Sequence, residues 1–383
     1  MIKSIKVMLI PNNKQNTKLF QSAGTSRFAY NWCLAKQQEN YKNGGKFISD
    51  CNLRKELTQL KKTNEYNWLN NYSCDIPKQA IKDACDSYKR FFKHQSDFPK
   101  FKSKRKSKPS FYQDNFKIQF TENKVYLSNI GFIKLAEKNR FPIGKGRTKE
   151  IKVMNPKVTY DGINWYISVG IEYEENTEQP TKQGIGIDIG IKDLAICSDE
   201  NTYKNINKTQ TIKKLKKKKH RLQRKISRKY LNNKKGSCYC KTSNIIKSEK
   251  ELLKLNHRLT NIRHNYLHQI TTEIVKNKPS YIVLEDLNVR GMMKNKHLAK
   301  AVQEQCFYEF YRQIEYKCNW NNIKFITADR YFPSSKLCSV CGNIKKDLKL
   351  SDRIYHCSEC ENVIDRDYQA ALNLAEYGRK LIA

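Results

Sequence analysis

Carboxylate side chains that could bind divalent metal ions occur in three separate segments of the sequence. Asp188 lies within the β-branched run Ile185–Ile191, which predicts a strand, a tight glycine-bearing turn and a second strand. Glu285 ends the short apolar run 281–284, which is typical of a buried central strand. Asp367 lies where a helical pattern begins. A carboxylate buried among apolar residues is costly unless something binds it, so these acids are candidate ligands.

Hard oxygen ligands of this kind suit Mg²⁺ or Mn²⁺. Two such ions, about 3.5–4 Å apart, can clamp the attacking and leaving oxygens during phosphodiester hydrolysis. No Ser-His-Asp or Cys-His arrangement in the sequence competes with this chemistry. Structural roles remain open for each segment: Asp188 as a turn cap, Asp286 as a solvated charge at a strand end, and Asp365 and Asp367 as first-turn acids that suit the helix dipole.

Two CxxC pairs near the end of the chain have the spacing of a zinc site: Cys338, Cys341, Cys357 and Cys360. Four thiolates make a closed tetrahedral site, so the ion would be structural and not hydrolytic. The segment that carries them is too short for a core of its own, and the metal would hold it together. An alternative second zinc site would use four other residues: Cys238, Cys240, His264 and His268. Ordinary packing or surface roles suit those four better.

The chain is strongly basic, with 74 Lys and Arg against 37 Asp and Glu, a net charge of +37. So large an excess repels itself unless a polyanion neutralises it, and nucleic acid is the obvious one. The charge gathers in the stretch 98–109, where phenylalanine rings offer stacking faces, and along 212–232. The predicted nucleic-acid contacts are Lys100, Lys102, Lys104, Arg105, Lys106, Lys217, Arg221 and Arg224. A disordered basic linker is the alternative for the stretch 98–109.

The sequence predicts a cytoplasmic protein, acting at the nucleoid, with no membrane partner. No apolar stretch reaches the length of a membrane span, and residues 1–6 alternate like a strand, without the apolar region of a signal peptide. The 13 cysteines are odd in number, and four of them have metal-ligand spacing. This usage indicates a reducing cytosol and not a disulfide framework.

The elements that must position these residues follow from hydrophobic periodicity. Residues 1–10 predict a strand, and helices are expected from Thr17 and from about Asp75. Residues 115–175 look β-rich, with a hairpin signal at 160–163, which suggests a small barrel interrupted by the helical segment. A polar linker is expected at 172–180. The patterns at 212–232 and 247–276 predict an antiparallel helical hairpin.

The three acidic segments resemble the three RuvC motifs of TnpB proteins and of the related type V CRISPR effectors. The resemblance covers nearly the whole chain, including the segments 23–32, 98–108, 284–293 and 297–301. Carried over by position, it implies catalytic roles for Asp188, Glu285 and Asp367, with Asp365 as a neighbouring acid that is the weaker candidate ligand. It also implies a zinc ribbon inserted between the second and third motifs.

The fold implied by this resemblance is multidomain α/β: an RNase H-like (RuvC) nuclease with an inserted zinc ribbon, plus an N-terminal β-barrel split by a helical lobe. The expected parts are a first portion of the barrel at 1–14, a helical recognition lobe at 15–112, the second portion of the barrel at 113–180, the nuclease with its helical hairpin at 181–332, the zinc ribbon at 333–361 and a final nuclease helix at 362–383.

The activity implied is RNA-guided DNA cleavage that depends on Mg²⁺ or Mn²⁺. A guide RNA from the transposon end would pair with a double-stranded DNA target beside a short motif, while the protein holds the backbones. One structural Zn²⁺ would complete the cofactors. The alternatives are an RNA-guided DNA-binding regulator, a transposition accessory protein without cleavage, and a compact type V CRISPR effector.

Four positions depart from the usual pattern of the family: Tyr355 replaces Trp, Glu361 replaces Gly, Ile364 replaces His and Gln369 replaces Asn. None of these changes removes a predicted ligand. They concern groups around the metals, and therefore the rate of the reaction.

Overall fold

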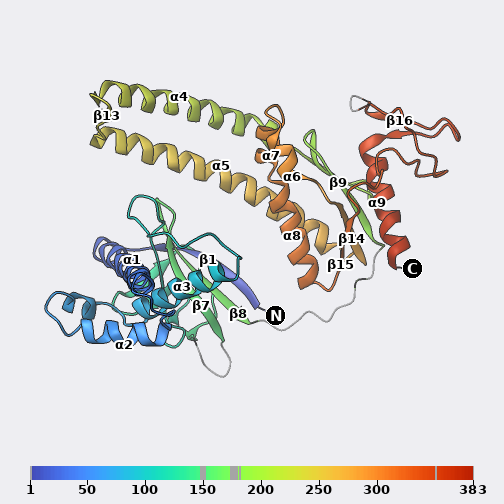
Figure 1. The fold of residues 1–383 in the computed structure, drawn as a ribbon. Helices are drawn as coiled ribbons and strands as arrows, with labels where there is room; N and C mark the ends of the chain where they lie inside the picture. Colours follow the sequence, from blue (N-terminus) through green and yellow to red (C-terminus); the bar gives the residue numbers. More distant parts are fainter. Residues whose placement is uncertain (1, 147–151, 173–179, 181–182, 350–351, 383) are drawn as a thin grey trace. The chain divides into compact units, whose positions relative to one another are not determined.

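A computed structural model describes residues 2–146, 152–172, 180, 183–349 and 352–382. The chain divides into two compact units, Met1–Glu174 and Glu175–Ala383, and each is described by itself (Figure 1). The segment 172–180, predicted to be a linker, lies almost entirely outside the described residues. Within the described part of the chain, no helix combines the length and the apolar character needed to cross a bilayer.

The first unit is built on an eight-stranded antiparallel sheet with the order β2-β7-β8-β1-β5-β4-β3-β6. Its strands are β1 (Ile2–Ile10), β2 (Ser110–Tyr112), β3 (Gln119–Phe120), β4 (Lys124–Leu127), β5 (Gly131–Leu135), β6 (Gly144–Lys145), β7 (Val153–Tyr160) and β8 (Trp165–Glu172). The predicted hairpin is confirmed, since Tyr160 pairs with Trp165. Asp161 Oδ1 accepts hydrogen bonds from two backbone N–H groups of that turn, both at 2.8 Å.

The sequence predicted a small barrel, but no closed barrel is seen among the described residues. The sheet has two free ends, β2 and β6, and no pairing joins them in the part of the chain that the structure describes. These edge strands span only three and two residues. Closing a barrel requires staggered pairing along whole strands, and edges this short offer little backbone to pair.

Helices fill the gap between β1 and β2, as the sequence predicted. They are α1 (Asn13–Lys42), α2 (Asp50–Leu60), the 3₁₀ helix η1 (Asn67–Asn71) and α3 (Asp75–Phe92). Asn12 and Gln15 form a capping box that fixes the start of α1. A hydrogen bond of 2.9 Å from Trp165 Nε1 to Asn16 Oδ1 then ties this helix to β8. The helices have their own core, which includes Leu34, Leu53 and Ile81.

The second unit contains a mixed five-stranded sheet of order β11-β10-β9-β14-β15. Its strands are β9 (Ile185–Ile189), β10 (Asp193–Cys197), β11 (Thr202–Lys204), β14 (Tyr281–Glu285) and β15 (Lys324–Ala328). Strands β9, β14 and β15 are parallel, whereas β10 is antiparallel to β9. The expected central strand is confirmed, because β14 lies between two parallel neighbours and its first four residues are buried.

Helices cover both faces of this sheet. One face packs on α5 (Ser243–Lys276) and α8 (Phe307–Trp320) through a core that includes Ile187, Ile270 and Phe310. The other face packs on α9 (Arg366–Ile382), with Leu374 against Val283. Three short helices occur in the connections that follow sheet strands along the chain. The 3₁₀ helix η2 (Ile206–Lys208) follows β11, and α6 (Val289–Lys294) and α7 (Ala299–Gln305) follow β14.

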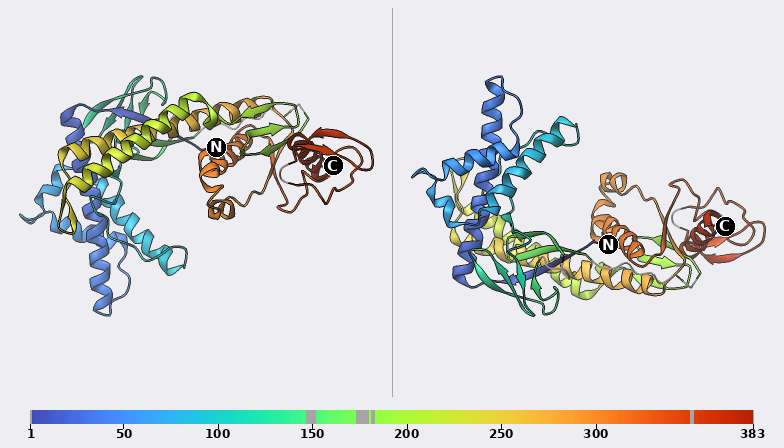
Figure 2. Two further views of the ribbon diagram at one scale, coloured as in Figure 1. Left: turned by 90° about the horizontal axis from the view of Figure 1, so that it is seen from above. Right: turned by 90° about the horizontal axis from the view of Figure 1, so that it is seen from below.

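The predicted helical hairpin is also confirmed. Helix α4 (Gln210–Asn232) and α5 run side by side, as Figure 1 and the left view of Figure 2 show. The two helices are joined by a small two-stranded ribbon, β12 (Lys234–Lys235) and β13 (Cys238–Tyr239). Apolar contacts among Ile212, Leu215, Leu255 and Leu259 hold the base of the hairpin together. The remaining positions of α4 carry most of its basic side chains into solvent.

A buried lysine joins α5 to α8 in this unit. Lys317 is 8% exposed, and its Nζ donates to the carbonyl of His268 and to the hydroxyls of Thr271 and Thr272 at 2.6–2.9 Å. Burial lowers the pKa of Lys317 from 10.5 to about 8. Its charged form is therefore disfavoured in the folded chain, and this cost is fully present below pH 8 and disappears as the pH rises towards 10.5.

We expect Lys317→Met to be more stabilising at pH 7 than at pH 9.5. Both threonine hydroxyls keep a helix carbonyl as a partner without the lysine, so its loss leaves no unpaired donor. The stability of the variant relative to the parent should fall by about 2 kcal/mol between the two pH values. Urea unfolding at each pH measures this, and a difference that does not change with pH would contradict the assigned pKa.

Candidate active site

Strand β9 carries Asp188 towards α9. Side chains alternate along a strand, so Gly186 and Asp188 lie on the same face. A Cβ on Gly186 would lie 2.1 Å from the carbonyl oxygen of Ala371 and 2.3 Å from the backbone nitrogen of Ala375. The backbone of α9 therefore packs directly on Gly186, and Asp188 comes next to the start of that helix.

Strand β14 brings Glu285 beside Asp188. The parallel ladder ends with Leu284 opposite Ile187, so the two acids are the next residues along adjacent strands. Both strands end at this edge of the sheet, where polar residues of parallel strands meet. The Ser334 hydroxyl donates a hydrogen bond to Glu285 Oε1. Burial raises the pKa of Glu285, and this hydrogen bond opposes the shift.

The third acid, Asp367, lies in the first turn of α9, as predicted. Two arginines pair with its carboxylate: Arg353 at 3.4 Å and Arg366 at 3.2 Å. Asp365 behaves differently. Its Oδ1 accepts from the backbone N–H groups of Asp367 and Tyr368, at 2.9 and 3.1 Å, so it caps the helix.

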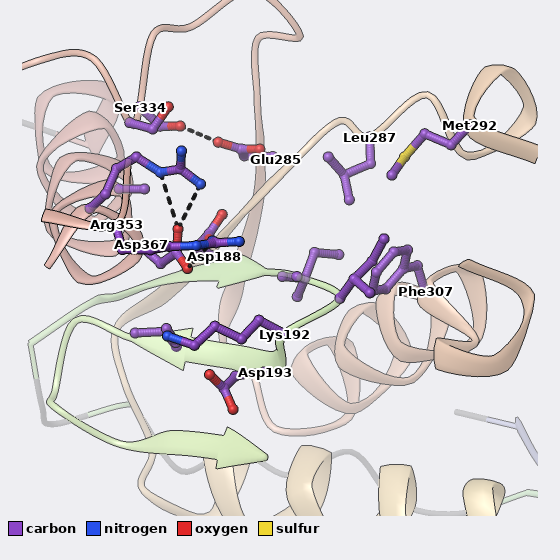
Figure 3. A pocket seen from close by; sticks show the side chains of 17 residues that line it. Asp188, Lys192, Asp193, Glu285, Leu287, Met292, Phe307, Ser334, Arg353 and Asp367 are labelled. Carbon is purple, nitrogen blue, oxygen red and sulfur yellow. Dashed lines mark hydrogen bonds and ion pairs between the residues drawn. The ribbon is translucent and has the colours of Figure 1, made fainter. Parts of the chain in front are cut away.

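The three predicted acids line one cavity of about 350 Å³, together with Ser334, Arg353 and Arg366. Figure 3 shows Asp188 and Asp367 close together, with Glu285 pointing to Ser334. Leu287, Met292 and Phe307 form an apolar wall. Burial, followed by the carboxylates of Glu285 and Asp367, raises the pKa of Asp188 to about 8. Its charged form is thus disfavoured without a neighbouring cation.

This donor set fits hard divalent cations. Three carboxylates from β9, β14 and α9 converge, and the repulsion that raises the pKa of Asp188 is what a bound cation removes. The carboxylate oxygens of the three acids are not as close to one another as the cysteine Sγ atoms, and among the described residues only the cysteines form so tight a group. Arginine and serine partners satisfy Asp367 and Glu285 instead, and a metal ion would compete with them.

The close approach at Gly186 gives a direct test of how α9 is placed. We expect Gly186→Ala to destabilise the chain by about 1–3 kcal/mol, because the added methyl group meets rigid helix backbone. The displaced helix would carry Asp367 away from Asp188 and lower any metal-dependent activity at least tenfold. Gly24→Ala is the matched control, since its added Cβ would have no atom within 4 Å. Thermal melting and an activity assay measure both, and equal behaviour of the two variants would contradict the packing argument.

The four predicted zinc ligands come together near the start of α9. The Sγ atoms of Cys338, Cys341, Cys357 and Cys360 all lie within 4.8 Å of one another. Two pairs lie at 3.6 and 3.5 Å, close to the edge of about 3.8 Å that a tetrahedron of 2.3 Å Zn–S bonds requires. Backbone N–H groups of Cys360 and Glu359 lower the pKa of Cys357 to about 6. This set fits one structural zinc ion, and the described residues contain no other such group, including one at Cys238 and Cys240.

The segment that carries the four cysteines is connected to the acidic cavity. The side-chain amide of Asn373 on α9 donates to the carbonyls of Ser334 and Leu337, both at 2.7 Å. Ser334, which precedes the first pair of cysteines, contacts Glu285. Arg353, which lies between the two pairs, contacts Asp367. Sequence reasoning missed these contacts, as it missed Gly186, because each of them joins distant parts of the chain.

The four departures from the family pattern have clear positions. Glu361 has a φ of 56°, in the left-handed region that favours glycine. Tyr355 is fully buried in the cysteine cluster, and Ile364 packs against it. Gln369 is fully buried, and neither atom of its amide has a hydrogen-bond partner within the described residues.

The predicted nucleic-acid contacts divide into two surfaces. On the first unit, Lys102 is half-buried over the ring of Tyr30, 3.5 Å from its centroid. Its neighbours are exposed: Lys100, Lys104, Arg105 and Lys106. On α4 three more are exposed: Lys217, Arg221 and Arg224. Arg221 also lines a cavity between α4 and α5.

Fold and site together define a basic protein with a carboxylate-lined cavity and a cluster of four cysteines that could bind one zinc ion. Three family models match it: one described as "Helix-turn-helix domain" at residues 1–46, one described as "Probable transposase" at 166–296, and one described as "Cas12f1-like, TNB domain" at 307–374. The last match contains the cysteine cluster and the start of α9.

Two curated relatives align along nearly the whole chain. "Putative RNA-guided DNA endonuclease InsQ" of Escherichia coli (strain K12) is 28% identical over 100% of this chain and 94% of its own length. "Putative RNA-guided DNA endonuclease" of Streptomyces pristinaespiralis is 28% identical over 98% of this chain and 89% of its own length. A Cas12f1 chain, solved as "Cryo-EM structure of the Cas12f1-sgRNA-target DNA complex", has the same fold, with a TM-score of 0.60, 13% identity and coverage of 98% of each chain. The protein is therefore similar over nearly its whole length to proteins of the TnpB type.

Proposed function

We propose that this protein is a transposon-associated, RNA-guided DNA endonuclease of the TnpB type, whose second unit is a RuvC-like nuclease. The observation that carries the proposal is the convergence of Asp188, Glu285 and Asp367 on one cavity. The relatives named as RNA-guided DNA endonucleases support the guided activity. The mixed sheet, with acids at the ends of two adjacent parallel strands and a third acid on a covering helix, supports the RuvC-like assignment.

In this proposal, the three carboxylates hold Mg²⁺ or Mn²⁺ at the end of the sheet. When bound, these ions would activate the attacking water and stabilise the leaving oxygen of the phosphodiester. Asp365 holds the first turn of α9 in place, and Ser334 orients Glu285. Arg353 and Arg366 balance the charge of Asp367 before metal binds, and can afterwards face the phosphate of the strand.

The first unit would hold the guide RNA and the DNA beside the target. We assign its sheet to the expected parts 1–14 and 113–180, and the helices between β1 and β2 to the helical recognition lobe at 15–112. The exposed basic residues between α3 and β2 supply charge for a phosphate backbone. A guided regulator, a transposition accessory protein and a compact CRISPR effector are the competing functions. The intact set of three acids favours cleavage over the first two.

The test is to purify the protein co-expressed with its own flanking genomic DNA. The co-purifying RNA is sequenced, and cleavage of double-stranded DNA matched to it is measured with Mg²⁺. A discrete RNA and matched cleavage are expected. A discrete RNA without cleavage would favour the guided regulator, and absence of any specific RNA would favour the transposition accessory protein.

A further inference from the structure

A second cavity, of about 410 Å³, lies where α4, α5 and α7 meet. It is lined by four cationic side chains, Lys216, Lys219, Arg263 and Lys300, against one carboxylate, Glu304. Glu304 pairs with Lys216 at 2.5 Å and with Arg263 at 3.5 Å. Lys219 and Lys300 have no ion-pair partner within the described residues, so the cavity presents uncompensated positive charge.

Buried hydrogen bonds connect this cavity to the turn that follows Asp188. Arg263 Nε donates to Asn207 Oδ1 at 2.7 Å. The Asn207 amide donates to Gln305 Oε1 at 3.3 Å, and Gln305 Nε2 donates to the carbonyl of Gly190 at 2.9 Å. Asn207 and Gln305 are 8% and 4% exposed, so these bonds are largely shielded from water.

The two cavities are also neighbours along the backbone. Cys306 lines the cationic cavity, whereas the next residue, Phe307, lines the acidic one. A polyanionic strand that fills the acidic cavity can therefore have another of its phosphates in the cationic one. A cavity lined by several cations binds a phosphodiester group more favourably than it binds a single carboxylate.

We propose that this cavity binds a backbone phosphate of the DNA strand that enters the acidic cavity. The site is distinct from the basic residues predicted from the sequence, which lie on the exposed surface of α4 and in the stretch after α3. Its identity as a DNA site and not an RNA site rests on the proposed function and on its link to the turn after Asp188. Lys219 and Lys300 would make the direct contacts, and Glu304 would hold Lys216 and Arg263 in place.

The test compares Lys219→Ala/Lys300→Ala with Lys213→Ala/Lys214→Ala. The control removes the same charge from exposed residues of α4 that do not line this cavity. Both pairs are made in an Asp188→Asn background, and the protein is used as it purifies, with any RNA that it retains. The probe is a fluorescein-labelled oligothymidylate, which has no designed match to a guide, and its Kd is measured by anisotropy over a range of salt concentrations.

We expect the cavity pair to weaken DNA binding about tenfold and to lower the salt slope by about 1.4, since two ionic contacts of roughly 0.7 each are lost. The control pair should change Kd by less than twofold. Equal effects of the two pairs would overturn the proposal, because general charge would explain them. A loss confined to an oligouridylate probe would overturn the DNA assignment. Since binding is measured without cleavage, a failure of the nuclease proposal leaves this result interpretable.

Discussion

Asp188→Asn should lower matched DNA cleavage at least about a thousandfold, because losing a direct metal ligand removes several kcal/mol of transition-state stabilisation. The fold should survive, since asparagine has nearly the same shape and the change removes a half-buried carboxylate that has a raised pKa. Melting temperature and single-turnover cleavage with Mg²⁺ measure the two effects. An unchanged melting temperature with lost cleavage is the expected pair of results.

Asp365→Asn is the matched control for this experiment. Asp365 accepts the two capping hydrogen bonds of α9, and asparagine caps helices as well as aspartate does. We therefore expect less than a fivefold loss of cleavage. Loss of cleavage in Asp365→Asn but not in Asp188→Asn would contradict the assigned metal ligands. It would indicate that Asp365, and not Asp188, binds the metal.

Loss of the zinc ion should be the second large effect. Cys357→Ser should lower bound zinc from one ion per chain to none, because a structural site needs all four thiolates. The segment 333–361 has only a small core of its own, made of the cysteines and Tyr355. It should therefore become sensitive to protease. Cleavage of DNA should fall at least tenfold as well, since Ser334 and Arg353 reach Glu285 and Asp367 from this segment.

Cys238→Ser is the control for the zinc experiment, because this cysteine is exposed and lies outside the four-cysteine group. It should keep one zinc ion and full protease resistance. Metal analysis by mass spectrometry reads the stoichiometry directly. Zinc retained in Cys357→Ser, or lost in Cys238→Ser, would contradict the assignment of the ligands.

Local patterns predicted much of this structure. The segments with helical periodicity are observed as α1, α3, α4 and α5. The predicted glycine-bearing turn after Asp188 joins β9 to β10. The CxxC pairs predicted a cluster that the fold assembles. These features depend on residues that are close in sequence, where periodicity and turn chemistry are informative.

What could not be predicted depends on contacts between distant segments. The β-rich region suggested a barrel, but the length of the edge strands β2 and β6 could not be read from alternation alone. Gly186 looked like an ordinary strand residue until α9 was seen to pack on it. Gln305 gave no sequence signal at all, although it is buried and bonded to Gly190.

Guidance by RNA is tested most directly by changing the guide. The co-purified RNA is replaced by one with a new target-pairing segment, and cleavage of the old and new DNA targets is measured with Mg²⁺. We expect cleavage to move to the new target and to be lost in Asp188→Asn. Cleavage that stays at the old site, or that ignores the guide, would contradict an RNA-guided mechanism and leave a nuclease whose specificity lies in the protein.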